Sequence, residues 1–230
     1  MENKKYYFDK NHPEYGIFDS EELGNALKVN SNIIEFTVEQ LASVLGSEKS
    51  GIQSAAIMSV SEEVVPKDIL AEYSEYDFIV FSDGGATGQG GPGGYGAVTI
   101  NCETGEVHEI MQAFKSTTNN RMELMATIEG LNAVPDNTNV IVIADSNYVV
   151  KHLDGSGWSR NNNDDLWPKA DAAIKKKKKV DFQHEYGHGE GSTFESKWNN
   201  RCDKLSNIAR EKLDLIDDEG YGPVSRFSTN

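Results

Sequence analysis

The stretch DFIVFSDGG, residues 77–85, carries the clearest structural signal in this sequence of 230 residues. Its apolar run from Asp77 to Ser82 predicts a buried strand, which is expected to end at Asp83 and two glycines. A second apolar run, Asn139–Ala144, is continuous enough for a strand buried on both faces, and Asp145 follows it directly. If the two strands are parallel neighbours, both carboxylates leave the sheet at the same edge.

The segments around these two strands predict an α/β fold. Residues 95–101 and 107–114 alternate apolar and polar side chains about a turn at 103–105, which is typical of a hairpin. Apolar residues at helical spacing, closed by Pro135, predict a helix over 120–134. Other runs predict helices over 146–153, 164–174 and 197–213, and a strand over 180–186. Their order predicts a mixed five-stranded sheet flanked by helices.

The chain is expected to divide into four parts. A small α/β N-terminal module is predicted over 1–46, a Ser- and Glu-rich linker over 47–75, the main domain over 76–216 and a flexible tail over 217–230. The N-terminal module is expected to contain two short strands and two helices, over residues 5–8, 33–36, 20–28 and 38–45.

The formal net charge of −15 argues against tight binding to phosphates, because that affinity usually comes from Lys and Arg. Residues 1–76 carry 6 basic and 14 acidic side chains, a net charge of −8, and residues 77–230 carry 16 and 23, a net charge of −7. Carboxylates that bind cations also add to the formal charge. The charge therefore lowers the expected affinity for nucleic acid without excluding it.

Cysteine content and hydropathy indicate the compartment. Cys102 and Cys202 provide no disulfide framework, and free thiols in a reducing cytoplasm are the simpler interpretation. No run approaches the roughly 18 apolar residues of a membrane span, and Met1–Lys10 is polar, without a signal-peptide core. We expect a cytoplasmic monomer that binds no membrane.

Four acidic residues are candidates for a metal site: Asp83, Glu123, Asp145 and Asp203. Glu123 lies in the first turn of the helix between the two strands, and Asp203 on the last helix can approach the same edge. Clustered carboxylates repel one another unless cations lie between them, and oxygen ligands without Cys or His suit Mg²⁺ or Mn²⁺. Each residue also has a simpler interpretation: Asp83 as a turn former, Glu123 and Asp145 as helix caps, and Asp203 as a solvated side chain.

Five motifs follow one another along the chain. The first two are DGGATGQGGPGGYG, residues 83–96, and TTNNRMELMA, residues 117–126. The later ones are ADSNYV (144–149), DLWPKADAA (165–173), and GH (187–188) with NRCD (200–203). Together, and in this order, they resemble the motifs of the ribonuclease H type 1 family of the bacterial kind.

The resemblance implies an endonuclease that hydrolyses the RNA strand of RNA–DNA hybrids by a two-metal-ion mechanism and leaves 5′-phosphate and 3′-hydroxyl ends. The four carboxylates would hold two Mg²⁺ ions, with Mn²⁺ as a possible substitute, and His188 would assist proton transfer or product release. Taken alone, His188 is typical of a loop histidine. Residues that the resemblance places at the substrate are Gly84, Gly85, Gln89, Thr118, Asn119, Asn120 and Asn147.

Some features depart from the family pattern. Gln89 stands where Asn is common, and the segment after His188 is longer than usual. The basic handle of many relatives is shortened to residues 154–163, in which only Arg160 is basic. Lys175–Lys179 is either a replacement basic patch or a solvated helix end. The following strand would place it roughly 23 Å from the site, which favours the solvated end.

The N-terminal module and the overall function leave alternatives open. KYYF at 5–8 and GIFDS at 16–20 faintly resemble a small hybrid-binding domain, but the negative charge and the lack of Trp favour weak hybrid binding or a protein partner. An integrase, transposase or junction resolvase would share the acidic cluster but not the TTNNRME context. A catalytically inactive hybrid-binding or scaffold protein would not need all four carboxylates.

Overall fold

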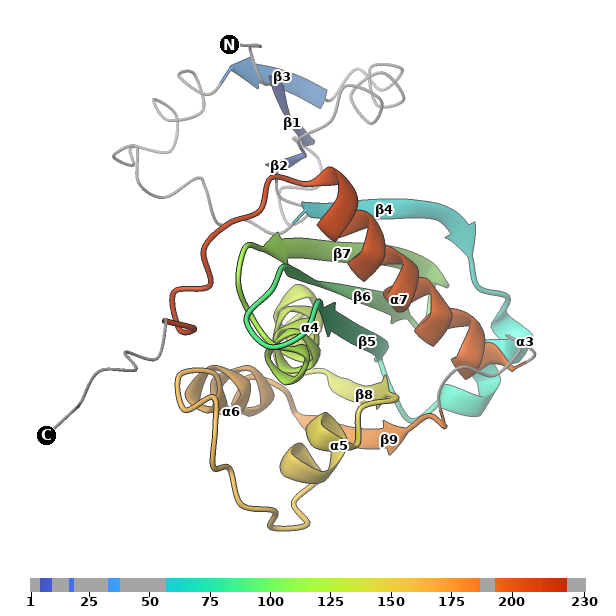
Figure 1. The fold of residues 1–230 in the computed structure, drawn as a ribbon. Coiled ribbons are helices and arrows are strands. Elements are labelled where there is room, and N and C mark those ends of the chain that lie inside the picture. Colours follow the sequence, from blue (N-terminus) through green and yellow to red (C-terminus); the bar gives the residue numbers. More distant parts are fainter. Residues whose placement is uncertain (1–4, 10–16, 19–32, 38–56, 187–192, 223–230) are drawn as a thin grey trace, which may run out of the picture. The chain divides into compact units, whose positions relative to one another are not determined.

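The computed structural model describes residues 5–9, 17–18, 33–37, 57–186 and 193–222 (Figure 1). The chain divides into two compact units, residues 1–60 and 61–230. In the first unit, β1 (Lys5–Asp9) pairs antiparallel with β2 (Ile17–Phe18) and with β3 (Ile33–Thr37). The strands predicted at 5–8 and 33–36 are confirmed, and the helices predicted at 20–28 and 38–45 lie outside the described residues.

The main sheet has six strands in the order β4-β7-β6-β5-β8-β9. Strands β5, β6 and β7 pair antiparallel, and β5, β8 and β9 pair parallel, so the mixed sheet is confirmed. The strands are β4 (Ile57–Val64), β5 (Phe78–Ala86), β6 (Gly93–Asn101), β7 (Glu106–Phe114), β8 (Asn139–Ala144) and β9 (Lys179–His184).

The sixth strand differs from the prediction of five. β4, the short helix α3 (Lys67–Leu70) and the 3₁₀ turn η3 (Ala71–Tyr73) all lie within residues 47–75, where a linker was expected. Serine and glutamate in β4 masked the strand signal, yet polar and charged side chains are common on strands at the edge of a sheet. The buried side chains that follow β4 are Val65, Leu70 and Tyr73.

Alternate side chains of β5 face two different layers of helix. Ile79 and Phe81 pack in one core cluster with Trp198 of α7 (Phe194–Lys212). Val80, between them, packs in another cluster with Leu131 of α4 (Asn119–Ala133). Because side chains alternate across a strand, α7 and α4 cover opposite faces of the sheet (Figure 1).

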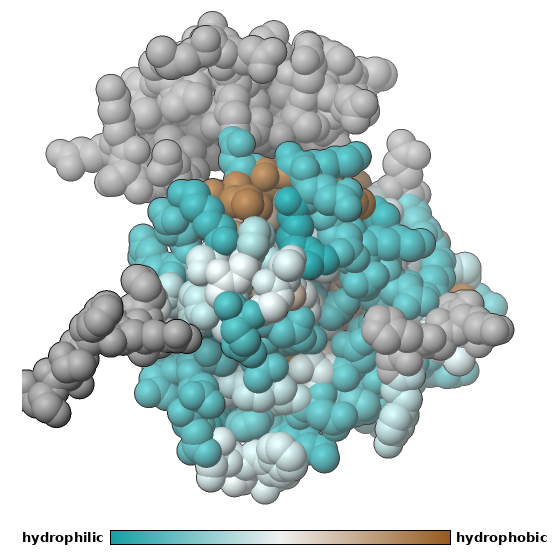
Figure 2. Space-filling view, in the orientation of Figure 1, coloured by the Kyte–Doolittle hydropathy of each residue, from teal (hydrophilic) through white to brown (hydrophobic). Residues whose placement is uncertain are grey.

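Two shorter helices complete the layer that contains α4. α5 (Asn147–Leu153) and α6 (Trp167–Lys175) share an apolar cluster with α4. Each predicted helix and strand of the main domain is found, with ends shifted by a few residues. None of the helices among the described residues is long and apolar enough to cross a membrane. The described surface in Figure 2 is largely hydrophilic.

The segment after α7 returns to the sheet. We call residues 214–222 the C-terminal strap. Ile216 forms a parallel bridge with Phe114, and Asp218 is buried. A flexible tail was expected over 217–230, and at residues 217–222 the structure differs because Asp218 is anchored by buried partners; residues 223–230 lie outside the described part.

Paired truncations test the role of residues 57–75, which form β4, α3 and η3. A protein of residues 57–230 should melt cooperatively, whereas residues 76–230 should melt well below it. The second truncation removes Val65, Leu70 and Tyr73 from the core, and each large apolar side chain lost costs about 2–5 kcal/mol. At roughly 2–4 °C per kcal/mol, calorimetry should resolve the difference easily. Equal melting temperatures would show that residues 57–75 add nothing to this core.

Candidate active site

Two of the four candidate carboxylates come from neighbouring parallel strands. Ser82 of β5 lies in register with Ala144 of β8, so the next residues, Asp83 and Asp145, leave the two strands side by side. The prediction that these strands are parallel neighbours is confirmed. Asp83 does not end its strand, because β5 continues in antiparallel pairing with β6. Asp83 is therefore a strand residue and not a turn former.

Helix α4 brings the third carboxylate to the same place. The helix starts at Asn119 with Thr118 as its N-cap, so Glu123 is its fifth residue and the capping-box interpretation is wrong. A Cβ atom at Gly84 would lie 2.6 Å from the amide nitrogen of Glu123. Only glycine at this position lets the helix approach β5 so closely.

The three carboxylates form a compact group. Oxygen atoms of Asp83, Glu123 and Asp145 lie within 4.8 Å of one another. Asp83 and Glu123 are buried and Asp145 is half-buried. Asp83 Oδ1 accepts a hydrogen bond of 2.7 Å from the amide of Gly84, whereas the buried Glu123 Oε2 has no hydrogen-bond partner among the described residues. A buried carboxylate oxygen without a donor is the arrangement expected of a group that binds a cation.

The electrostatics of the group agree with that interpretation. Burial, together with repulsion from the neighbouring Asp145 carboxylate, raises the pKa of Asp83 to about 7. Burial also raises the pKa of Glu123 well above its ordinary value, with added repulsion from Asp83 and Asp145. The group resists full ionisation unless positive charge is supplied. A divalent cation with a preference for oxygen ligands fits these residues.

The fourth candidate, Asp203, lies on α7 beside the group but not within it. Its charge raises the pKa of Asp83, so it is close, yet its oxygens are not among those within 4.8 Å. Asp203 is half-buried, and Asn207 Nδ2 donates to its Oδ1 at 3.1 Å. The solvated-side-chain interpretation therefore does not describe it.

The cap interpretation of Asp145 is also wrong. Ser146 is the N-cap of α5, and its hydroxyl accepts a hydrogen bond of 3.4 Å from the amide of Val149. Asp145 is left free of a capping role. Asn147, a predicted substrate contact, is the exposed first residue of the same helix.

The other predicted substrate contacts gather around the start of α4. Asn119 and Asn120 are exposed in its first turn, directly after Thr118. Asn119 Oδ1 would lie 3.7 Å from a Cβ atom at Gly85, so the helix start lies beside the end of β5, directly before the glycine-rich loop of residues 87–92. Gln89 is exposed in that loop. His188 lies outside the described residues.

Two basic groups that could attract nucleic acid are used within the fold. Arg160 Nη1 lies 2.8 Å from both oxygens of Asp171, and its guanidinium stacks over the ring of Trp167. In the lysine run, Lys177 is buried and its Nζ donates to the carbonyl of Val134 at 2.6 Å. At Lys177 the structure differs from the expected solvated helix end.

Some residues near the site had been assigned no role from the sequence. Arg121 lies inside the TTNNRMELMA motif and is buried between Asp165 and Asp218. Arg210 lies beside Gly85, and its charge lowers the pKa of Asp83. A buried arginine requires acidic partners, but spacing along the chain does not identify them.

Comparisons with known proteins agree with the geometry. A sequence model of the RNase H family matches residues 75–211. "Ribonuclease H" of Idiomarina loihiensis is 36% identical over 156 residues, 62% of this chain and 94% of that protein. "Ribonuclease H" of Trichodesmium erythraeum is 37% identical over 158 residues, 63% of this chain and 96% of that protein. The protease-reverse transcriptase of prototype foamy virus resembles the fold alone, with a TM-score of 0.51 at 21% identity over 61% of this chain and 22% of that chain.

The raised pKa of Asp83 predicts a pH-dependent stability in the absence of metal. The folded protein keeps a proton up to about pH 7 that the unfolded chain releases near 3.8. The part of the stability that depends on Asp83 is therefore complete below its unfolded pKa of 3.8, falls as the pH rises from there to about 7 and then levels off. Asp83→Asn should remove this loss and melt above the wild type at pH 8 in chelator, by roughly 2–4 °C for each kcal/mol recovered.

The difference between the two proteins should be much smaller at pH 4, where Asp83 is protonated in the folded state and still partly protonated in the unfolded chain. Glu103→Gln, on the exposed hairpin turn, serves as the control and should follow the wild type throughout. An Asp83→Asn protein that melts at the same temperature as the wild type at pH 8 in chelator would contradict the assignment.

Proposed function

Because the chain belongs to the ribonuclease H family of endoribonucleases, we propose that it hydrolyses the RNA strand of RNA–DNA hybrids. The observation that carries the proposal is the group of three carboxylates with a partnerless buried oxygen. A structural acidic cluster would be expected to have donors for its buried oxygens. Here that oxygen is left for a ligand.

The residues that would hold the metal are Asp83, Glu123 and Asp145, with Asp203 beside them. Two Mg²⁺ ions, or Mn²⁺ in their place, would supply the charge that stabilises the attacking and leaving oxygens of an in-line displacement at phosphorus. The protein's part is to fix the carboxylates on a rigid sheet and helix, so that they need not reorganise during the reaction. We propose products with 5′-phosphate and 3′-hydroxyl ends, and a role for His188 in proton transfer or product release.

Substrate recognition is proposed to depend on the start of α4 and the glycine-rich loop. Asn119, Asn120 and the hydroxyl of Thr118 offer neutral hydrogen-bonding groups one helical turn from Glu123. Gly85 carries no side chain between the substrate and its backbone amide, whereas Gly84, also among the proposed contacts, packs against α4 and its amide donates to Asp83. Such groups suit the ribose 2′-hydroxyl, which distinguishes RNA from DNA. Gln89 and Asn147 are proposed as further contacts.

Further proposals concern the oligomeric state, the cellular location and the N-terminal module. The catalytic part is proposed to act as a monomer in the cytoplasm. The N-terminal module is proposed either to bind hybrid weakly or to bind a protein partner, and the three-stranded sheet β2-β1-β3 supports only its being a separate folded unit.

Substitution of the strand carboxylates tests the metal site. Asp83→Asn and Asp145→Asn should each lower cleavage of a labelled hybrid by more than about 100-fold. Loss of a residue that only supports a metal ligand typically lowers activity by about 10–100-fold. Cleavage should require Mg²⁺ or Mn²⁺ and stop in chelator. Glu103→Gln should cleave like the wild type. Near-normal turnover of either Asn variant with Mg²⁺ would place the site elsewhere.

The second test concerns the choice of substrate. The enzyme should cut the RNA of a hybrid and leave duplex DNA and duplex RNA uncut at comparable enzyme concentration. A single 2′-deoxy substitution beside the scissile phosphate should protect that position, because the hydroxyl to be recognised is gone. Ligation and primer extension of the products would identify the 5′-phosphate and 3′-hydroxyl. Efficient cutting of duplex DNA would favour an integrase-like or resolvase-like enzyme.

A further inference from the structure

The C-terminal strap is joined to the body of the domain by backbone and side-chain contacts. The amide of Ile216 donates to the carbonyl of Ala113 at 3.1 Å, and the amide of Lys115 donates to the carbonyl of Ile216 at 2.8 Å. Two residues later the strap places Asp218 inside the domain, where its side chain is 1% exposed. A buried carboxylate is stable only with good partners, so this position has a structural or functional purpose.

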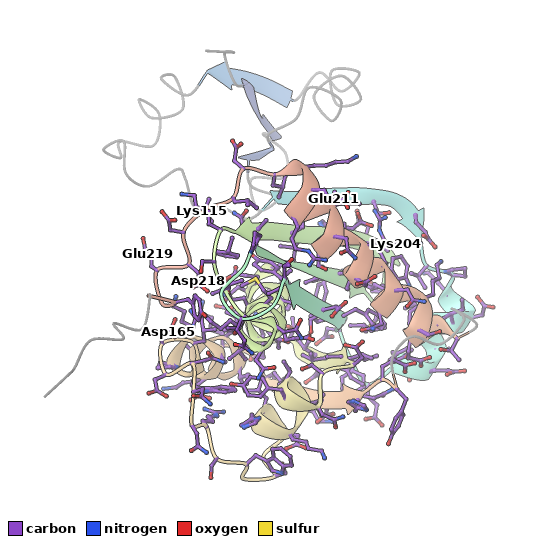
Figure 3. All side chains as sticks on the ribbon, in the orientation of Figure 1. Lys115, Asp165, Lys204, Glu211, Asp218 and Glu219 are labelled. Carbon is purple, nitrogen blue, oxygen red and sulfur yellow. The ribbon has the colours of Figure 1, made fainter. Side chains whose placement is uncertain are left out.

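Asp218 accepts hydrogen bonds from two residues at the start of α4. Arg121 donates to it from Nε and from Nη2, both at 2.7 Å, and Thr117 donates from its hydroxyl at 2.7 Å. The other side of the Arg121 guanidinium is held by Asp165, at 2.7 and 2.8 Å. Asp218 and Asp165 lie near each other beside α4 in Figure 3.

Thr117 also forms backbone hydrogen bonds with the glycine-rich loop. Its carbonyl accepts from the amide of Gly90 at 2.9 Å, and its amide donates to the carbonyl of Gly91 at 3.0 Å. The hydroxyl of Tyr221, also on the strap, lies 3.1 Å from the position of a Cβ atom on Gly90. Asp218 and Tyr221 therefore contact both sides of the junction between the loop and the helix.

The proposed substrate contacts lie on the two segments that Asp218 joins. Thr118, Asn119 and Asn120 directly follow Thr117 and precede Arg121. Gln89 belongs to the glycine-rich loop, and Gly84 and Gly85 lie at the end of β5 just before that loop. Asp218 itself is not part of the carboxylate group at which cleavage is proposed. Its contacts can therefore affect where the substrate is held, while Glu123, two residues after Arg121, is held by the close packing of α4 on Gly84.

We propose that the C-terminal strap is a positioning element for the nucleic-acid substrate, and that Asp218 is its positioning residue. Through Arg121 and Thr117, Asp218 fixes the first turn of α4 relative to the glycine-rich loop. The inference rests on the proposed function, because the segments it positions are those proposed to contact the hybrid.

Gly220 shows how closely the strap covers this ion pair. A Cβ atom at Gly220 would overlap the carboxylate of Asp165 and the guanidinium of Arg121, which hold each other in place. Gly222, two residues on, has open space around the same position. Gly220→Ala and Gly222→Ala therefore form a matched pair that disturbs or spares the strap without changing any charge.

A second matched pair tests the carboxylate itself. Asp218→Asn removes the buried charge, whereas Asp217→Asn removes only an exposed one, in a 3.1 Å pair with Lys115. Steady-state cleavage of a labelled hybrid should be measured well below the melting temperature of each full-length variant. Asp218→Asn and Gly220→Ala should raise KM about fivefold or more with kcat within about twofold, the pattern of lost substrate binding. Asp217→Asn and Gly222→Ala should match the wild type.

Amide hydrogen exchange gives a readout that does not depend on activity. The amides of Gly90 and Thr117 should exchange faster in Asp218→Asn and Gly220→Ala than in the wild type, because local opening of this junction becomes easier. If Asp218→Asn does not fold, steady-state cleavage and amide exchange can both still be measured on Gly220→Ala.

The outcomes separate this inference from the proposed function. A lower melting temperature with unchanged KM and unchanged exchange at Gly90 would make the strap a purely stabilising element and overturn the inference. A fall in kcat at constant KM would also overturn it, since the strap would then act on the carboxylate group. If the wild type cuts no hybrid, the proposed function fails and the substrate role of the strap fails with it. The exchange result is separate, because it can still show that Asp218 holds the loop in place.

Discussion

The parallel pairing of β5 with β8 is the constraint on which the site depends. Its register places Asp83 next to Asp145, and two carboxylates at that separation repel each other. Helix α4 adds Glu123 to the same small volume. The fold therefore contains a destabilising group that bound positive charge or protonation relieves, and the rest of the domain must be rigid enough to keep it in place.

Rigidity at this point comes from burial on both faces of β5. Ile79 and Phe81 pack toward α7 while Val80 packs toward α4, and all three side chains are completely buried. A strand packed in this way cannot shift to separate the Asp83 carboxylate from its neighbours without loss of core contacts. Gly84 then lets α4 approach closely enough for Glu123 to join the group. The packing that joins the layers therefore also fixes the geometry of the site.

The distribution of basic groups explains how so acidic a protein can be suited to a nucleic acid. Arg121, Arg160 and Arg201 are each paired with carboxylates within the fold. Their charge is used within the fold, while Arg210 lies beside Gly85. In the proposed function, recognition of the substrate therefore depends mainly on backbone amides and on neutral side chains such as Asn119 and Asn120. Neutral groups of this kind read geometry and hydroxyls better than they attract phosphates. The accurate placement of the loop and the helix start consequently matters more than charge.

The sequence alone determined the type and order of the elements in the main domain, because apolar runs and helical spacing are local properties that survive in any context. It also indicated that Asp83 and Asp145 share a sheet edge, which the observed parallel register confirmed. The edge strand β4 and the anchored strap were decided only by tertiary structure. Ile216 pairs with Phe114, and Asp218 meets Arg121, across about a hundred residues of chain. No local pattern distinguishes a polar segment that finds such distant partners from one that stays in solvent, since the stabilising hydrogen bonds exist only once the sheet and helix have assembled.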